Sequence, residues 1–185
     1  DLKLTEELRG TLERIKGILV WLDLLYLGID YEPWKVYFLG LTASLSADAF
    51  TRVVERMQIQ DRDIVHAIST RKQVGRALKE VSQLKGKKNY PLYKILSPFS
   101  AEILLCSMAK TKSEKIQKSI STFFSRLKGT KVLLKGKDLI AMGYEPGPLF
   151  KDIFDSILEA RLEGDVSTRE DEIEFLKERF GKVVK

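Results

Sequence analysis

The residues with the clearest chemical potential surround a Pro-Gly-Pro turn at residues 146–148. Gly143 can end a short helix, and Pro148 suits the first position of the next helix. Gly147 lets another molecule approach the backbone closely, and the first N–H groups of a helix attract anions. Lysines flank the turn in the sequence, namely Lys131, Lys135, Lys137 and Lys151. The pattern fits a phosphate-binding corner, and it fits equally a capped helical corner whose lysines are only solvated.

Other residues with chemical potential have structural explanations. His66 lies among apolar residues, so we interpret it as a core or groove residue rather than a base. Cys106 stands beside leucines and is expected to be a small core hydrophobe. Trp21 and Trp34 lie on apolar helix faces, where core packing is favoured over stacking on bases.

The sequence lacks the motifs of common catalytic sites. It contains no GxxxxGK[ST] or GxGxxG loop, no GxSxG elbow and no HExxH pair. Its single histidine and single cysteine exclude a thiolate-rich metal centre within one chain. Asp61 and Asp63 could hold magnesium, but they stand where a helix begins, and the helix dipole favours acids there. We expect no catalytic and no metal-binding residue, and an independent enzyme is the weakest hypothesis.

Charge is distributed unevenly along the chain of 185 residues. The whole chain has a net charge of +6, whereas residues 65–151 alone carry +13. The segments before and after carry −3 and −4. A basic middle is typical of nucleic-acid binders, although lysine-rich helix faces that are merely solvated would give the same sum. The basic segments lack a one-sided aromatic and leucine face, so we expect no membrane partner.

One stretch resembles a known family. The pattern G-x-D-L-x-x-x-G-x-x-P-G-P is matched at residues 136–148, and A-x-L-x-G-x-x-x-T-x-E-E is matched at residues 160–171 except that Asp171 replaces the last Glu. Both resemble the C-terminal region of bacterial tRNA nucleotidyltransferases of the poly(A) polymerase family, which add CCA, CC or A. Residues 24–39 and 92–98 look like the longer members, which also contain CBS modules.

The resemblance implies a body and a tail without the catalytic head. The family's head has a Gly-Gly-x-Val-Arg-Asp signature and paired aspartates that bind two metals, and this chain has neither. We therefore expect no cofactor in this chain, while the parent protein would use Mg²⁺ with ATP or CTP in its head. The first residue is Asp1, so we also expect an excised or processed chain. In the family, body and tail hold the tRNA acceptor stem and elbow.

Helical periodicity dominates the elements that must position these residues. Apolar residues recur at three or four positions, and hairpin signals are absent, although residues 131–134 could be extended. We predict an all-α array of about nine or ten helices, in a body subdomain at residues 1–84 and a tail subdomain at residues 85–185. Predicted helices cover residues 4–27, 33–41, 46–57, 61–81, 98–109, 113–127, 137–143, 148–164 and 167–181. A break at Gly75 is possible in the fourth. Ser97, Thr111 and Ser167 are the predicted caps at the starts of the fifth, sixth and last helices, and Gly129 is the predicted cap at the end of the sixth.

The main hypothesis is a cytoplasmic, RNA-binding body and tail that are inactive alone. Its predicted phosphate contacts are Arg126, Lys128, Lys131, Lys135, Lys137 and Lys151, supported by the backbone at Gly147. A helical interaction or dimerisation module is the alternative, because the first 60 residues are acidic and rich in large apolar side chains. Such a module would bind the missing head and neck or a second copy.

Overall fold

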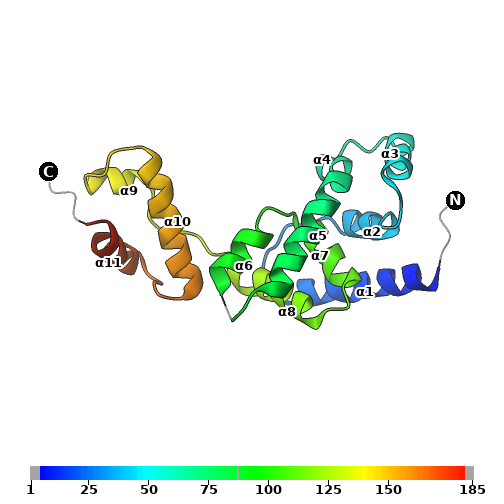
Figure 1. Ribbon diagram of the computed structural model, residues 1–185, viewed down its shortest axis with the longest axis horizontal. Coiled ribbons are helices and arrows are strands. Elements are labelled where there is room, and N and C mark those ends of the chain that lie inside the picture. The colour runs from blue at the N-terminus through cyan, green and yellow to red at the C-terminus, as the bar shows by residue number, and fades with distance from the viewer. Residues whose placement is uncertain (1–4, 87, 182–185) are drawn as a thin grey trace.

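The computed structural model describes residues 5–86 and 88–181, which form helices joined by short loops. Within these residues there is no β-strand, which confirms the predicted all-α fold. Figure 1 shows an elongated molecule of two lobes, with the described ends of the chain at opposite extremes. We call the larger lobe, which ends near residue 127, the body lobe, and the smaller lobe, which begins near residue 132, the tail lobe.

In its described residues, the body lobe contains eight α-helices and a π-helical turn. They are α1 Glu6–Leu24, α2 Pro33–Leu41, α3 Ala47–Arg56, α4 Arg62–Val65, α5 Ala67–Gln83, α6 Asn89–Leu96, α7 Ala101–Lys110, α8 Glu114–Thr122 and the π-helix Phe123–Leu127. Its core lies where α1, α2 and α7 pack together, with Ile15, Val36 and Leu104 fully buried. Gly40 allows the close approach of α2 to α1, because a Cβ there would lie 2.6 Å from Cδ1 of Ile15.

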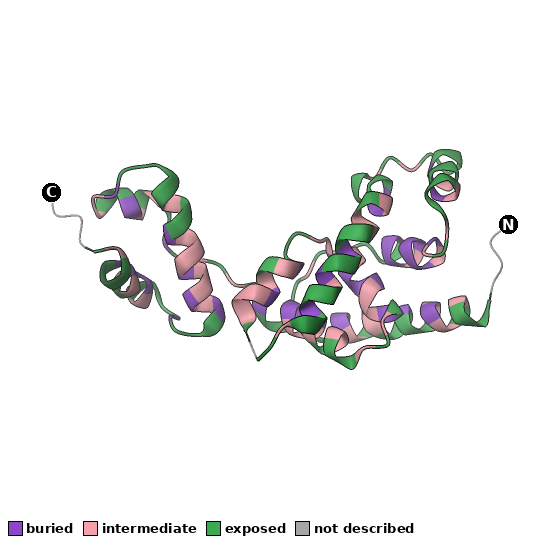
Figure 2. Ribbon diagram, in the orientation of Figure 1, coloured by how far each residue is buried: buried purple, intermediate pink, exposed green. Residues whose placement is uncertain are grey.

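The tail lobe contains three helices with a separate hydrophobic core. They are α9 Gly136–Ala141, α10 Pro148–Glu163 and α11 Arg169–Phe180. Leu139, Ile153, Ile157 and Leu176 are fully buried between them. Figure 2 shows exposed outer faces on α9 and α11, whereas most of α10 after its first turn is of intermediate burial. The predicted domain boundary between residues 84 and 85 stays a prediction, although the hydrophobic clusters divide near residue 130.

Several predicted helix ends are confirmed. Pro33 begins α2, and the Ser46 hydroxyl accepts a hydrogen bond from the Ala49 N–H at 3.3 Å at the start of α3. Pro148 begins α10, and Gly164 follows it in the left-handed conformation with φ at +91°. Only glycine adopts that conformation without strain, so the sequence located this end correctly.

Other predicted helix starts are wrong by a few residues. Ser97, Thr111 and Ser167 are the predicted N-caps of α7, α8 and α11. The observed N-caps are Ser100, Ser113 and Thr168, respectively. Each region offers two hydroxyl side chains, and the direction in which the chain enters the helix decides which one caps it. Ser97 instead donates its backbone N–H to Tyr93 O and closes α6.

The predicted helix breaks also move. The fourth predicted helix breaks at His66, between α4 and α5, and continues without interruption through Gly75. The predicted left-handed cap at Gly129 is wrong, because that residue does not have a positive φ. The chain leaves α8 through the π-helix, where Lys128 N donates to Phe123 O at 2.8 Å. Helix α1 ends at Leu24 rather than near Leu27.

The burial predictions are confirmed for Cys106 and Trp21 and corrected for His66 and Trp34. Cys106 is buried, and desolvation raises the pKa of its thiol to about 11. His66 is exposed, with Nδ1 2.8 Å from Arg62 O, so it lies neither in the core nor on the wall of a groove. Trp34 is 46% exposed, whereas Trp21 packs partly buried against the body core.

Within the described residues, no single helix has the length and apolarity needed to cross a membrane. Helices α6 and α7 satisfy that test only as a pair, and they are bent by 105°.

Candidate nucleic-acid interface

The starts of α9 and α10 lie next to each other in the tail lobe. A Cβ built on Gly136, the first residue of α9, would lie 3.8 Å from Cε2 of Phe150 in the first turn of α10. Lys135 and Lys137 flank Gly136, and Lys151 follows Phe150. Three predicted site lysines thus stand next in sequence to two residues that lie close together in space. We call this region the tail corner.

An extended segment brings Lys131 to the same lobe. The N–H groups of Leu133 and Leu134 donate to the carboxylate of Glu172 at 3.0 and 2.9 Å. Glu172 is fully buried and also accepts a hydrogen bond from Arg161 at 2.8 Å. A buried carboxylate is costly unless it is hydrogen-bonded, and two of its donors here are backbone N–H groups of this segment. Glu172 on α11 therefore holds in place the segment that leads from Lys131 to the tail corner.

The lysines of the tail lobe are free to meet an external anion. Lys131, Lys135, Lys137 and Lys151 are exposed, and none forms an ion pair with the residues that the structure describes. The acidic Asp138 between them is already engaged: it accepts from the Lys135 N–H at 2.7 Å and from Arg169 at 2.9 Å. These contacts, with the backbone hydrogen bond first, lower the pKa of Asp138. Two further acids, Glu145 and Asp152, are exposed beside the start of α10, so the four lysines leave this region with a net positive charge rather than a purely cationic surface.

The N-terminus of α10 has no side-chain cap. Gly147 is the N-cap, and Pro148 at the first position has no N–H to satisfy. Phe150 N donates to Gly147 O at 3.0 Å, so part of the turn is paired internally. The φ of Gly147 is 174°, which any residue adopts, and a Cβ there would meet nothing within 4 Å. No contact inside the chain therefore requires glycine at this exposed position.

Two predicted site residues lie apart from the tail corner. Arg126 is exposed on the π-helix of the body lobe. Lys128 follows the same turn and is half-buried, with Nζ 5.3 Å from the ring centroid of Phe124. Burial lowers the pKa of Lys128. The structure therefore divides the seven predicted residues into a tail group of five and a body group of Arg126 and Lys128.

Sequence reasoning missed two kinds of residue. Arg169 orients the acid of the tail corner, and it occupies a variable position of the motif. The contacts of Asn89 and Tyr90 with α10 join residues 73 positions apart, so no local spacing indicates them. Asp61, one of the two aspartates considered for magnesium, has a structural role: it pairs with the buried Lys35 at 2.7 Å and caps α4.

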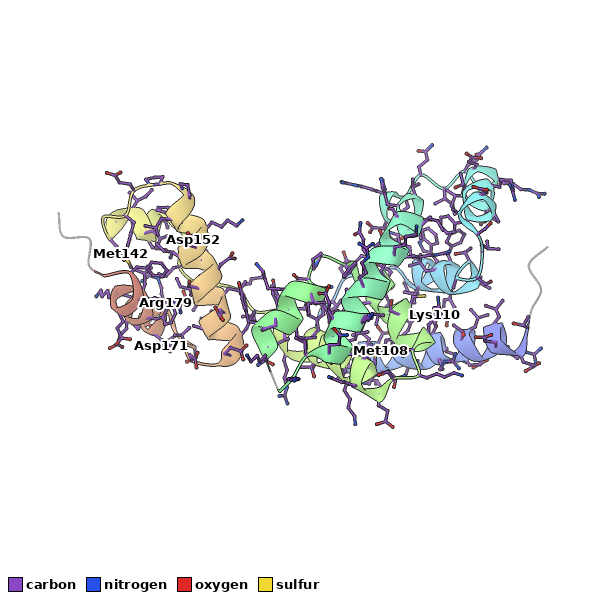
Figure 3. The ribbon with its side chains drawn as sticks, viewed as in Figure 1. Met108, Lys110, Met142, Asp152, Asp171 and Arg179 are labelled. Atoms are coloured by element: carbon purple, nitrogen blue, oxygen red, sulfur yellow. The ribbon has the colours of Figure 1, made fainter. Side chains whose placement is uncertain are left out.

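The arrangement offers charge and backbone donors rather than catalytic groups. Figure 3 labels Asp152 and Asp171 in the tail lobe, on different helices, with Met142 and Arg179. In the described part of the chain, no three His, Cys, Asp or Glu side chains are grouped so that they could hold a metal ion. What the corner can do is bind an extended anion by lysine and helix N-termini.

Comparison with known proteins agrees with the resemblance found in the sequence. The chain is 33% identical over 177 residues to the A-adding tRNA nucleotidyltransferase of Geobacter sulfurreducens. This match covers 94% of the chain. This chain corresponds in sequence to one part of a tRNA nucleotidyltransferase. It spans only about a fifth of the length of that relative, 20% by the alignment. No protein-family profile matches the chain.

Two solved structures share the fold. A tRNA-processing enzyme in an apo form has a TM-score of 0.66 and 20% identity, over 87% of this chain and 39% of its own. The Thermotoga maritima CCA-adding enzyme complexed with tRNA has a TM-score of 0.67 and 17% identity, over 97% of this chain and 43% of its own. The likeness to the second structure extends over both lobes of this chain.

Proposed function

We propose that this chain is the body and tail part of a tRNA nucleotidyltransferase-like enzyme and that it binds the acceptor stem and elbow of tRNA. The observation that carries the proposal is the tail corner, where exposed lysines without acidic partners surround two helix starts. Lysines and helix N-termini bind phosphates without reading sequence, which suits the shape-based recognition of folded RNA. One structural neighbour is a CCA-adding enzyme complexed with tRNA, which supports the same partner here.

Nucleotide addition would then belong to a part of the parent enzyme that this chain does not contain. The head signature is absent from the sequence, and the aspartate pair Asp61 and Asp63 stands outside any such signature, with Asp61 paired to Lys35. Under this proposal, Mg²⁺ and ATP or CTP bind in that head, in the cytoplasm, and the present chain holds the RNA for it. The expected enzymatic activity of the chain alone is nil.

The proposal is tested by the binding of a fluorescently labelled tRNA at two salt concentrations. A single strand of equal length is the competitor, since a binder of folded RNA prefers the tRNA while a generic polycation binds both. We expect salt-sensitive binding with preference for tRNA. Weak binding without preference would show that the basic segment is only solvated surface, and would reject the proposal.

A dimerisation module is the second candidate, and one surface favours it. The end of α1 and the start of α2 expose large apolar side chains, namely Val20, Leu24, Leu25, Tyr26, Leu27 and Trp34. Contiguous apolar surface often marks an interface. Sedimentation velocity over a range of protein concentrations tests this candidate: a concentration-dependent rise in sedimentation coefficient supports it, and a constant monomer value rejects it.

A further inference from the structure

The two lobes hold each other where α6 begins and α10 ends. Asn89 Nδ2 donates to Leu162 O at 2.7 Å, and the Tyr90 N–H donates to Glu163 Oε1 at 2.8 Å. No side chain of the body lobe caps α6, because its N-cap residue, Lys88, makes no side-chain hydrogen bond. The carboxylate of Glu163 therefore occupies the place of an N-terminal cap, where negative charge is favourable. We call this contact the lobe joint.

Hydrophobic packing strengthens the lobe joint. Leu162 is 4% exposed and belongs to the core of the body lobe, although it lies on a helix of the tail lobe. Leu158, one turn earlier, packs against the same core. Lys94 and Asp155 add an ion pair at 3.8 Å between side chains that are about half exposed. The C-terminal half of α10 is thus fixed to the body, while its N-terminus carries part of the tail corner.

Because α10 is fixed to the body at one end only, a small rotation at the lobe joint produces a larger displacement at the other end of the helix. Helix α10 has 16 residues, which corresponds to a length of about 24 Å. A tilt of about 10° at the joint would therefore displace the start of α10 by roughly 4 Å. Such a shift would change the spacing between the corner lysines and the cations of the body lobe by about the length of a hydrogen bond or more.

We propose that Glu163, together with Asn89, is a positioning residue that sets the spacing between the tail corner and the cations of the body lobe, so that both engage one folded RNA. The inference rests on the proposed function. Neither residue needs to touch the RNA. The affinity for an RNA that contacts only one lobe should not depend on the lobe joint. The affinity for an RNA that contacts both lobes should depend on it, because simultaneous contacts require the correct distance between the lobes.

Because Glu163 is negatively charged, a positioning role and a purely electrostatic effect predict opposite changes in tRNA affinity when it is replaced. Replacing Glu163 by Ala removes a negative charge, so electrostatics alone predicts tighter binding to every RNA. Loss of positioning predicts the opposite for tRNA and little change for a short hairpin. Glu163→Gln keeps a carbonyl oxygen that can accept from the Tyr90 N–H, so it should restore most of the geometry. Glu178→Ala is the matched control, since Glu178 is an exposed acid of the tail lobe on α11.

Two measurements are made on the same set of variants. The first is the distribution of distances between spin labels at Lys72→Cys on α5 and Glu174→Cys on α11, both exposed positions. Cys106 can stay, because it is buried and its thiol has a pKa of about 11. The second is the affinity for tRNA and for a short hairpin.

We expect Glu163→Ala to broaden the distance distribution and to weaken tRNA binding about 3- to 10-fold, with the hairpin unchanged or tighter. Glu163→Gln and Glu178→Ala should keep the narrow distribution. An unchanged distribution in Glu163→Ala would overturn the positioning role. A broadened distribution with unchanged tRNA affinity would overturn its link to RNA. Failure of the unmodified chain to bind any RNA would reject the proposed function, and the distances would still decide the role of the joint.

Discussion

At the residue scale, the tail lobe depends on a single buried carboxylate. Glu172 accepts hydrogen bonds from two backbone N–H groups and from Arg161, and it is wholly buried. Removing one partner of a buried pair leaves the other charge without compensation. The extended segment before α9 would lose its anchor at the same time. The position of the corner lysines is therefore tied to a residue that does not itself face the solvent.

We predict that Glu172→Ala destabilises the tail lobe by about 3–5 kcal/mol, the usual cost of breaking a buried ion pair. Both tryptophans lie in the body lobe, so tryptophan fluorescence reports on that lobe, whereas circular dichroism reports on both. Thermal or urea unfolding should show an early loss of helix with the fluorescence transition unchanged. Glu174→Ala, at an exposed position of the same helix, is the control and should behave like the unmodified chain. A single unshifted transition for Glu172→Ala would contradict the prediction.

Asp171 gives the start of α11 a predictable dependence on pH. Its carboxylate accepts from the N–H groups of Thr168 and Ser167, each at 2.8 Å, and these bonds hold its pKa well below the ordinary value. A carboxyl whose folded pKa is depressed contributes stability above its unfolded pKa of 3.8 and loses it as the pH falls toward the folded value. Asp171→Asn should therefore lower the melting temperature near neutral pH, and the difference should shrink between pH 4 and pH 2. A difference that is constant with pH would show that the charge plays no part.

At the element scale, one glycine decides how closely α1 and α2 pack. The side chain of Ile15 occupies the space beside Gly40, which is why a Cβ would come within 2.6 Å of it. Gly17 on α1 has no neighbour within 4 Å of its Cβ position, so a methyl group there meets nothing. Replacing glycine by alanine should therefore change the stability of the body lobe in opposite directions at the two positions.

We predict that Gly40→Ala destabilises the body lobe by about 1–3 kcal/mol through overpacking. Gly17→Ala should instead stabilise it by up to about 1 kcal/mol, because alanine loses less backbone entropy in a helix. Urea unfolding monitored by tryptophan fluorescence measures both. Equal effects for the two variants would refute the packing argument.

The elements also show what could be predicted from the sequence. Pro33, Pro148 and Gly164 marked helix ends correctly, because their backbone restrictions act locally. Caps were misplaced where two hydroxyl residues compete, as with Ser97 and Ser100. The tail corner was predicted as a group of lysines around a turn, but its contact between Gly136 and Phe150 was not. Contacts such as Asn89 with Leu162 depend on how lobes fold together, and no local pattern encodes them.

At the scale of the whole molecule, two separate cores carry two groups of cations. The tail corner lies on the small lobe, and Arg126 lies on the body lobe, with the lobe joint between them. Under the proposed function, this organisation presents spaced positive charge to an RNA whose shape, rather than sequence, is recognised.

The most direct test of this account is the salt dependence of tRNA affinity for the Lys135→Ala/Lys137→Ala double variant. Each phosphate contact contributes about 0.7–0.9 to the slope of log affinity against log salt concentration, so losing two contacts should reduce that slope by about 1.4 to 1.8. Lys16→Ala/Arg52→Ala removes the same charge from exposed positions of the acidic first segment and should leave the slope within about half a unit. A double variant whose slope equals that of the unmodified chain would contradict the assignment of RNA binding to the tail corner.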